Sequence, residues 1–255
     1  MIRFFKAFYM TLGMFIAIPL PVFIWDEDCV DLMMPCFPFV GAVIGLLWWG
    51  TAEALIFFGV HDAIAAAALT LATLFTAGLI HLDGYMDTSD AVLSRRPLEE
   101  RIRILKDPHT GSFSVIMVVA LFMAQFAAAF AIIENGRHTV LLVIIAVLSR
   151  CGSAFATLVL TPAPHSSNVN MYRDRPVGIL HKATGPVIAI AASAIAYLVA
   201  GVGGLIVSAS AVLGYTCAMA YVYNDLKGVS GDLAGFSLVL SELCGLIALA
   251  LVSHA

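Results

Sequence analysis

The chain has 255 residues, of which 61% are hydrophobic and 12% are charged, and its mean hydropathy is +0.98. Soluble domains average about 45–50% apolar and about 25% charged residues, so this composition excludes an ordinary water-soluble domain and predicts an integral membrane protein. The net charge of −4 identifies no partner, because most of the surface should face the lipid bilayer, and we expect no nucleic-acid partner.

Apolar segments define the expected architecture, because a membrane-spanning helix needs about 20 apolar residues. Segment 4–24 is apolar but contains Pro19 and Pro21, which interrupt helical hydrogen bonding, so we expect it to follow an interfacial or re-entrant path. The predicted fold class is all-α, a polytopic integral membrane helical bundle of about seven spans with this additional N-terminal segment, in a single domain over residues 1–255. The expected spans are 35–59, 63–82, 112–134, 139–160, 184–201, 204–223 and 233–253.

The polar segments 83–111, 161–183 and 224–232 should share one side of the membrane, because two crossings separate each pair. Together they hold nine of the thirteen Lys and Arg residues. The positive-inside rule predicts that this side is cytoplasmic. The same reasoning places the acidic segment 26–32 on that side.

The stretch HLDGYMDTSD, residues 81–90, follows the second expected span and contains three aspartates. If the helix continues, Asp83, Asp87 and Asp90 share one face within about 60°, where like charges repel. A hard divalent cation such as Mg²⁺, which prefers oxygen ligands, would offset this repulsion. A helix cap or a solvated loop is the alternative, but a cap explains only one aspartate. Gly84 would let a bulky ligand approach the backbone.

The following basic segment predicts a short amphipathic helix over 98–106 on the membrane surface. Arg101 is a candidate substrate ligand there, although a basic residue in this position also serves topology or headgroup binding. Lys106 and Asp107 are stronger candidates, because they close the helix before a turn that leads back into the membrane. Arg173, in the long loop 161–183, is a second candidate for substrate binding.

Arg150 lies midway along an expected span, where an unpaired cation costs about 2.5–3.5 kcal/mol, so it should face a polar cavity and an anion. Glu53 is the other ionisable residue at that depth and a candidate partner. Asp225 and Asp232 reach the same membrane face as the HLDG stretch. Because Asp232 opens the last span, helix capping is an equal alternative to metal binding there.

Acidic residues from two regions, with nearby cations, indicate metal-assisted transfer of a phosphoryl or pyrophosphoryl-activated group. The residues alone leave an intramembrane Mg-dependent prenyltransferase open, although such enzymes usually show two sets of DxxxD-like spacing. A non-enzymatic transporter is also open, but it would be expected to place ionisable groups near the midplane and to show internal repeats.

GLIHLDGYMDTSDAVLS and ILKDPHTGSF resemble the HLDGLADTxDG and MKDSRxGTFG signatures of the cobalamin synthase family, the adenosylcobinamide-GDP ribazoletransferases. The similarity extends over essentially the whole chain. It includes IPLP with FPFVGAVIG, the Ser149-Arg150 pair, and Ser230-Gly231-Asp232 followed by Gly235 and Glu242. The sequence differs from the family pattern at Ala17-Ile18, Ala91, Pro108-His109 and Val239.

The resemblance implies transfer of the cobinamide phosphate of adenosylcobinamide-GDP to the 3′-hydroxyl of α-ribazole, or of its 5′-phosphate, with release of GMP. It implies an enzyme of the prokaryotic plasma membrane whose active face is cytoplasmic, and it leaves a homo-oligomer open. In this hypothesis Lys106 and Arg150 offset phosphate charge, and His81 either accepts the proton of the attacking hydroxyl or is structural. The hypothesis assigns Mg²⁺ to Asp83, Asp87, Asp90 and Asp232.

Overall fold

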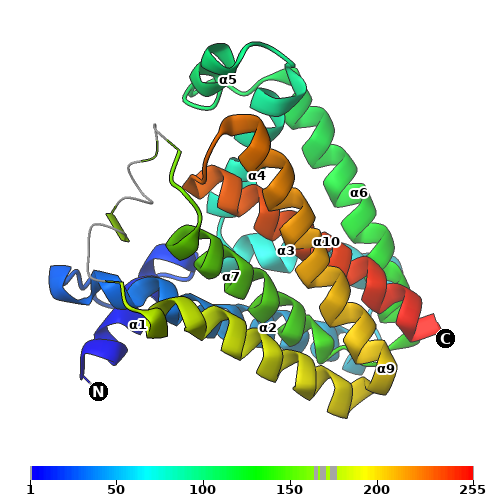
Figure 1. The fold of residues 1–255 in the computed structure, drawn as a ribbon. Helices are drawn as coiled ribbons and strands as arrows, with labels where there is room; N and C mark the ends of the chain where they lie inside the picture. Colours follow the sequence, from blue (N-terminus) through cyan, green and yellow to red (C-terminus); the bar gives the residue numbers. More distant parts are fainter. Residues whose placement is uncertain (1, 164–165, 167–170, 173–176, 255) are drawn as a thin grey trace.

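The computed structural model describes residues 2–163, 166, 171–172 and 177–254, and this part of the chain is helical without a β-strand (Figure 1). Arg173 lies outside the described residues. The elements are α1 (Ile2–Phe15), the 3₁₀ helix η1 (Glu27–Leu32), α2 (Met33–Phe57), α3 (Asp62–Ala77), α4 (Ile80–Leu93), α5 (Leu98–Ile104), α6 (Ser112–Asn135), α7 (Leu141–Val159), α9 (Ile179–Leu226) and α10 (Gly231–His254).

The predicted all-α membrane bundle is confirmed. Within the described residues, five helices are long and apolar enough to cross a membrane, or up to six if the bent pair of α3 and α4 forms one span. The seven expected segments all fall on these helices, because α9 contains two of them. The short surface helix expected at 98–106 is α5.

The helix α9 is divided by a break at Ala200 and Gly201, whose backbone dihedrals are not helical. Gly201 has a φ of 57°, which glycine adopts without the steric cost that a side chain brings. Figure 1 shows the chain turning sharply within α9, so that two legs, 179–199 and 202–226, lead away from the turn. This break matches the expected boundary between the segments 184–201 and 204–223.

The second expected span, 63–82, differs from the structure in an instructive way. The helix α3 ends at Ala77, Gly78 has a φ of 72°, and α4 departs at 99° to α3. The aspartates therefore do not continue the helix of an apolar span. They lie on a separate helix that turns across the end of the bundle.

The N-terminal segment folds back on itself. The helix α1 is not among the helices that could span a membrane, and Lys6 pairs with Asp26 at 2.9 Å. Arg3 pairs with Asp31 at 3.1 Å, and His181 at the start of α9 lies 3.6 Å from the same carboxylate. The chain thus returns to the face from which it starts, as expected for a path that does not cross the membrane.

The segments expected on one face converge. Arg101 of α5 forms an ion pair with Asp225 at the end of α9. The backbone N–H of Val229 donates to Thr161 at 2.9 Å, and that of Ala163 donates to Val229 at 2.9 Å. At the other end of the bundle, Ser253 donates to the carbonyl of Arg137. The described parts of these polar segments therefore lie together.

The helix α7 lies at the centre of the bundle and packs against α2, α9 and α10. A Cβ atom on Gly41 of α2 would lie 2.6 Å from the carbonyl oxygen of Ala146, so only glycine allows this backbone approach. Arg150 of α7 is 1% exposed and forms an ion pair with Glu242 of α10. The expected anion partner is thus present, but Glu53 is not that partner, because it accepts hydrogen bonds from Trp49 and Thr139.

The folded-back N-terminus predicts the result of cysteine labelling from the two sides of the membrane. Arg3→Cys and His181→Cys should react with an impermeant maleimide from the same side, because both residues contact Asp31. Arg137→Cys should react from the opposite side. The exposed Cys217 should first be replaced by Ser. If Arg3→Cys reacted only from the side of the membrane that labels Arg137→Cys, the folded-back path would be refuted.

The buried ion pair predicts non-additive stability. Arg150→Met or Glu242→Leu alone should lower the free energy of unfolding by about 3–5 kcal/mol, because each leaves a buried polar group without its partner. The double replacement Arg150→Met with Glu242→Leu should recover much of this loss. Unfolding of all variants in one detergent measures the coupling, and a double variant as unstable as the sum of both singles would contradict the pairing.

Candidate active site

The helix α4 carries the acidic residues at one end of the bundle, beneath α5 (Figure 1). Asp83 is exposed, Asp87 is partly buried and Asp90 is buried. The stacked rings of Tyr85 and Phe236, with centroids 5.3 Å apart, join α4 to α10. This contact determines which face of α4 packs against the first turns of α10.

Two glycines allow α4 and α10 to touch through their backbones. A Cβ atom on Gly84 would lie 2.8 Å from the Cα and the carbonyl oxygen of Asp232, and one on Gly235 would lie 3.3 Å from the Cα of His81. The expectation that a ligand approaches Gly84 is therefore wrong, because α10 fills that space. The same contact brings Asp232, which is 149 positions later in the sequence than Asp83, to the acidic face of α4.

The four carboxylates form one electrostatic group. Asp87 experiences the charges of Asp83, Asp232 and Asp90. No three His, Cys, Asp or Glu side chains in the described residues are close enough together to hold a metal ion. Mg²⁺ is usually bound by one or two carboxylates when substrate phosphates supply further ligands, so a site of this kind does not need three carboxylates together. The chemistry of the donor set therefore fits Mg²⁺.

Asp90 has a structural role that its spacing does not reveal. One carboxylate oxygen accepts from the backbone N–H of Gly111 at 2.8 Å, and the other accepts from that of Ser114 at 3.0 Å. Asp90 thus accepts hydrogen bonds from two backbone N–H groups at the start of α6. The N-cap residue of α6, Gly111, has no side chain that could do so. Metal binding by Asp90 stays a prediction.

His81 lies on α4 behind the acidic face. Its ring stacks on Phe15 with centroids 5.7 Å apart and lies 5.9 Å from Phe37. It is 9% exposed, and its Nε2 atom has no hydrogen-bond partner among the described residues. A cavity of about 100 Å³ is lined by His81 together with Asp232, Ser153, Thr157 and Tyr172. His81 and Asp232 therefore border the same space.

The remaining candidate residues differ in their burial and in their partners. Arg150 is held by Glu242 inside the bundle, and its guanidinium also donates to Ser149 at 3.0 Å. Arg101 is partly buried and paired with Asp225. Lys106 and Asp107 are exposed after α5, where Asp107 accepts from the backbone N–H of His109 at 3.0 Å. Arg150 therefore lies inside the bundle, whereas Arg101, Lys106 and Asp107 lie on or directly after α5.

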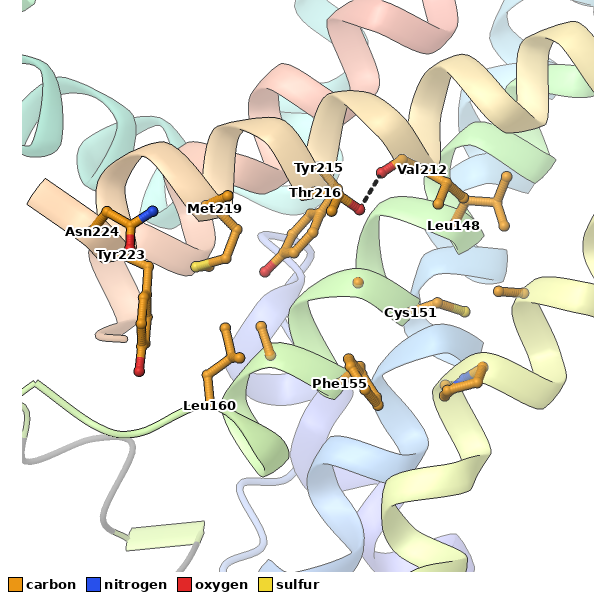
Figure 2. Close-up of a pocket in the computed structure, with 16 residues that line it drawn as sticks. Leu148, Cys151, Phe155, Leu160, Val212, Tyr215, Thr216, Met219, Tyr223 and Asn224 are labelled. Carbon is orange, nitrogen blue, oxygen red and sulfur yellow. Dashed lines mark hydrogen bonds between the residues drawn. The ribbon is translucent and has the colours of Figure 1, made fainter. Parts of the chain in front are cut away.

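A larger cavity, of about 420 Å³, lies between α7 and the two legs of α9 (Figure 2). Sequence reasoning misses it, because a gap between apolar helices has no spacing signature. Its lining includes Cys151, Phe155, Tyr215, Met219 and Tyr223. A tyrosine hydroxyl in the middle of an apolar run is the one signal that points to this place.

Comparison with known proteins gives a consistent result over nearly the full length. A family model described as cobalamin-5-phosphate synthase matches residues 7–250. A protein of Clostridium botulinum (strain Alaska E43 / Type E3) is 34% identical over 248 residues, covering 95% of this chain and 96% of that protein. One of Clostridium perfringens (strain SM101 / Type A) is 33% identical over 249 residues, covering 98% and 99%.

A third relative, from Lachnoclostridium phytofermentans, is 29% identical over 247 residues, covering 93% of this chain and 90% of that protein. All three relatives are named adenosylcobinamide-GDP ribazoletransferase. No solved structure matches the chain. The extent of the family match and the identity to full-length relatives show that this chain belongs to the cobalamin-5-phosphate synthase family.

Proposed function

We propose that this chain is an adenosylcobinamide-GDP ribazoletransferase, which completes the nucleotide loop of cobalamin. The observation that carries the proposal is the family match over residues 7–250 together with relatives of that name at 33–34% identity. The family membership removes the support for a prenyltransferase or a transporter.

The proposed reaction is a displacement at phosphorus. The 3′-hydroxyl of α-ribazole, or of its 5′-phosphate, attacks the phosphorus that bears the cobinamide. A new P–O bond forms, the bond to the bridging oxygen of the pyrophosphate breaks, and GMP leaves with that oxygen. The hydroxyl proton is released, so an acceptor near the attacking oxygen would assist the step.

The proposed Mg²⁺ ligands are drawn from Asp83, Asp87, Asp90 and Asp232. When bound, the ion would neutralise charge on the pyrophosphate and on the leaving phosphate. The mutual repulsion of these carboxylates supports cation binding, because a bound cation would offset it. Asp83, Asp87 and Asp232 are the stronger candidates, since both oxygens of Asp90 already accept backbone hydrogen bonds.

Lys106 and Arg101 are the proposed contacts to the substrate phosphates, with Arg173 as a further candidate. Asp107, the neighbour of Lys106, belongs to the same proposed site. The exposure of Lys106 supports this role, because its ammonium group is available to a ligand. Arg101 would have to exchange Asp225 for a phosphate group. Arg150 acts at a distance in this proposal, because Glu242 balances its charge inside the bundle.

His81 is the proposed proton acceptor. The support is its Nε2 atom, which has no hydrogen-bond partner in the part of the chain that the structure describes, and the cavity that it shares with Asp232. The enzyme would work at the cytoplasmic face of a prokaryotic plasma membrane, because the surface that carries the acidic group also carries most Lys and Arg residues of the chain.

The first test is GMP release from adenosylcobinamide-GDP and α-ribazole by the protein in lipid, with and without Mg²⁺. GMP release should require Mg²⁺. Asp83→Asn should reduce the release at least about 100-fold, because electrostatic stabilisation of the reacting phosphate is lost. Asp62→Asn, an exposed aspartate at the far end of α3, is the matched control and should retain activity. Unchanged release by Asp83→Asn would refute the role of Asp83 as a metal ligand.

A second test addresses His81. His81→Gln should lower kcat about 100-fold if the imidazole accepts the proton, while unfolding in detergent stays similar. His254→Gln, at the opposite end of α10 from Asp232, is the control and should turn over normally. Near-normal turnover of His81→Gln would remove His81 from the mechanism.

A further inference from the structure

The turn between α5 and α6 holds a histidine side chain in one orientation. Asp107 accepts the backbone N–H of His109 at 3.0 Å, and the same carboxylate oxygen lies 2.7 Å from the ring Nδ1 atom. Pro108 lies between the two residues and restricts the backbone of the turn. The His109 side chain is 89% exposed. One carboxylate therefore holds both the backbone and the ring of His109, and the Nε2 atom points away from Asp107.

The other end of this turn rests on the acidic group of α4. The backbone N–H of Gly111 donates to Asp90 at 2.8 Å. Successive Cα atoms span at most about 3.6 Å each, so the Cα of His109 lies within about 7 Å of the Cα of Gly111. Figure 1 shows α5 and the chain that follows it above the end of the bundle that carries α4. His109 therefore lies beside the Asp90 end of the acidic group.

Charged groups surround the histidine. Lys106 is exposed directly before Asp107, and Arg103 acts electrostatically on Asp107. The hydrogen bonds from the ring and from the backbone N–H of His109 lower the pKa of Asp107, so this carboxylate is ionised at neutral pH. Asp90 lies beneath the far end of the turn. An ionised carboxylate thus orients a ring that has two further cations near it.

The hydrogen bond to Asp107 decides which nitrogen carries the proton in the neutral ring. An ionised carboxylate only accepts, so Nδ1 donates, and Nε2 then presents a lone pair that repels a phosphate oxygen. In the protonated ring both nitrogens donate, and the Nε2–H group can bind a phosphate through a charge-assisted hydrogen bond. His109 therefore offers a phosphate-binding group only when the ring is protonated.

We propose that protonated His109 binds a phosphate oxygen of the pyrophosphate substrate, and that Asp107 is the positioning residue that orients the ring. The proposed Mg²⁺ would hold the pyrophosphate at the acidic group, and His109 lies at the edge of that group. This inference rests on the proposed function, because it concerns how one of that reaction's substrates is bound. It gives Asp107 a chemical role, which its place beside Lys106 alone does not.

The test measures binding of adenosylcobinamide-GDP to the full-length protein by titration calorimetry, with Mg²⁺ and without the acceptor, so that no turnover occurs. Histidine changes charge between about pH 5 and pH 8, so measurements at about pH 5.5 and about pH 8.5 compare the two forms. The intact protein should bind about tenfold more weakly at the higher pH, because one charge-assisted hydrogen bond is lost. His109→Gln should bind with this lower affinity at both pH values.

Two further variants isolate the charge of His109. His109→Arg carries a cation at every working pH, so it should bind tightly at both pH values. Groups that titrate elsewhere, Asp87 among them, affect this variant and the intact protein alike, so the difference between the two reports on His109. His138→Gln is the matched control, because His138 is exposed in the segment between α6 and α7, and it should keep the pH dependence of the intact protein.

Asp107→Asn tests the positioning role. The asparagine can still accept the backbone N–H of His109, but it no longer holds a charged ring. Binding at about pH 5.5 should weaken when His109 is present, and Asp107→Asn should have no further effect in the His109→Gln background. A purely structural role of Asp107 in the turn would cost the same affinity in both backgrounds, and that result would contradict the positioning role.

A lipid headgroup is the competing source of a phosphate, because α5 is a surface helix. The loss of affinity in His109→Gln should be the same in a maltoside detergent, which contains no phosphate, as in phosphatidylglycerol nanodiscs. A loss confined to the nanodiscs would identify a lipid phosphate as the ligand and overturn the inference.

Two other outcomes would also overturn it. One is unchanged binding of adenosylcobinamide-GDP by His109→Gln at about pH 5.5, and the other is an equal pH dependence in the intact protein and in His109→Arg. If the intact protein neither bound adenosylcobinamide-GDP nor released GMP, the proposed function itself would fail. Normal GMP release by the intact protein, together with either of the first two outcomes, would contradict the role of His109 alone.

Discussion

The site depends on the backbone contact between α4 and α10. Gly84 lies against Asp232, and Gly235 lies against His81. With side chains at these positions the helices would separate, and the carboxylate of Asp232 would leave the acidic group of α4. Two glycines, by having no side chain, thus determine which charges lie together. The bend at Gly78 has a related effect, because it turns α4 by 99° from the direction of α3.

The interior of the bundle contains polar groups that compensate one another. Arg150, Glu242 and Ser149 form a hydrogen-bonded set between α7 and α10, at a depth where an isolated charge would be costly. The same two helices carry Ser153 and Asp232, which border the cavity of His81. The ion pair therefore holds together the helices that build the site, even though it is not itself exposed to a water-soluble substrate.

Much of the architecture could be predicted from sequence, because apolar length is a strong signal. The helix boundaries near 112–135 and 231–254, the surface helix α5 and the break in α9 all follow from runs of apolar residues and their interruptions. The end of α3 could not, since Gly78 sits inside an apolar run and only its positive φ ends the helix.

The site was predictable in its residue types but less so in its contacts. Spacing alone places Asp83, Asp87 and Asp90 on one face, yet it cannot show that Gly111 and Ser114 already occupy both oxygens of Asp90. Depth in the membrane suggested Glu53 as the partner of Arg150, but the choice depends on which helices pack against α7, and Glu242 lies on one that does. Pairing across helices is a tertiary property, which single-helix periodicity does not encode.

The two classes of ion pair in this chain differ in their response to ionic strength. Arg3 and Lys6 are exposed, so dissolved salt weakens their attraction to Asp31 and Asp26. The screening length is roughly 10 Å at 0.1 M ionic strength. Arg150 and Glu242 are enclosed by protein, where dissolved ions do not enter. Concentrated salt therefore weakens the ion pairs of α1 and leaves the pair of Arg150 and Glu242 intact, while the buried Ala7 and Met10 keep α1 packed against the bundle.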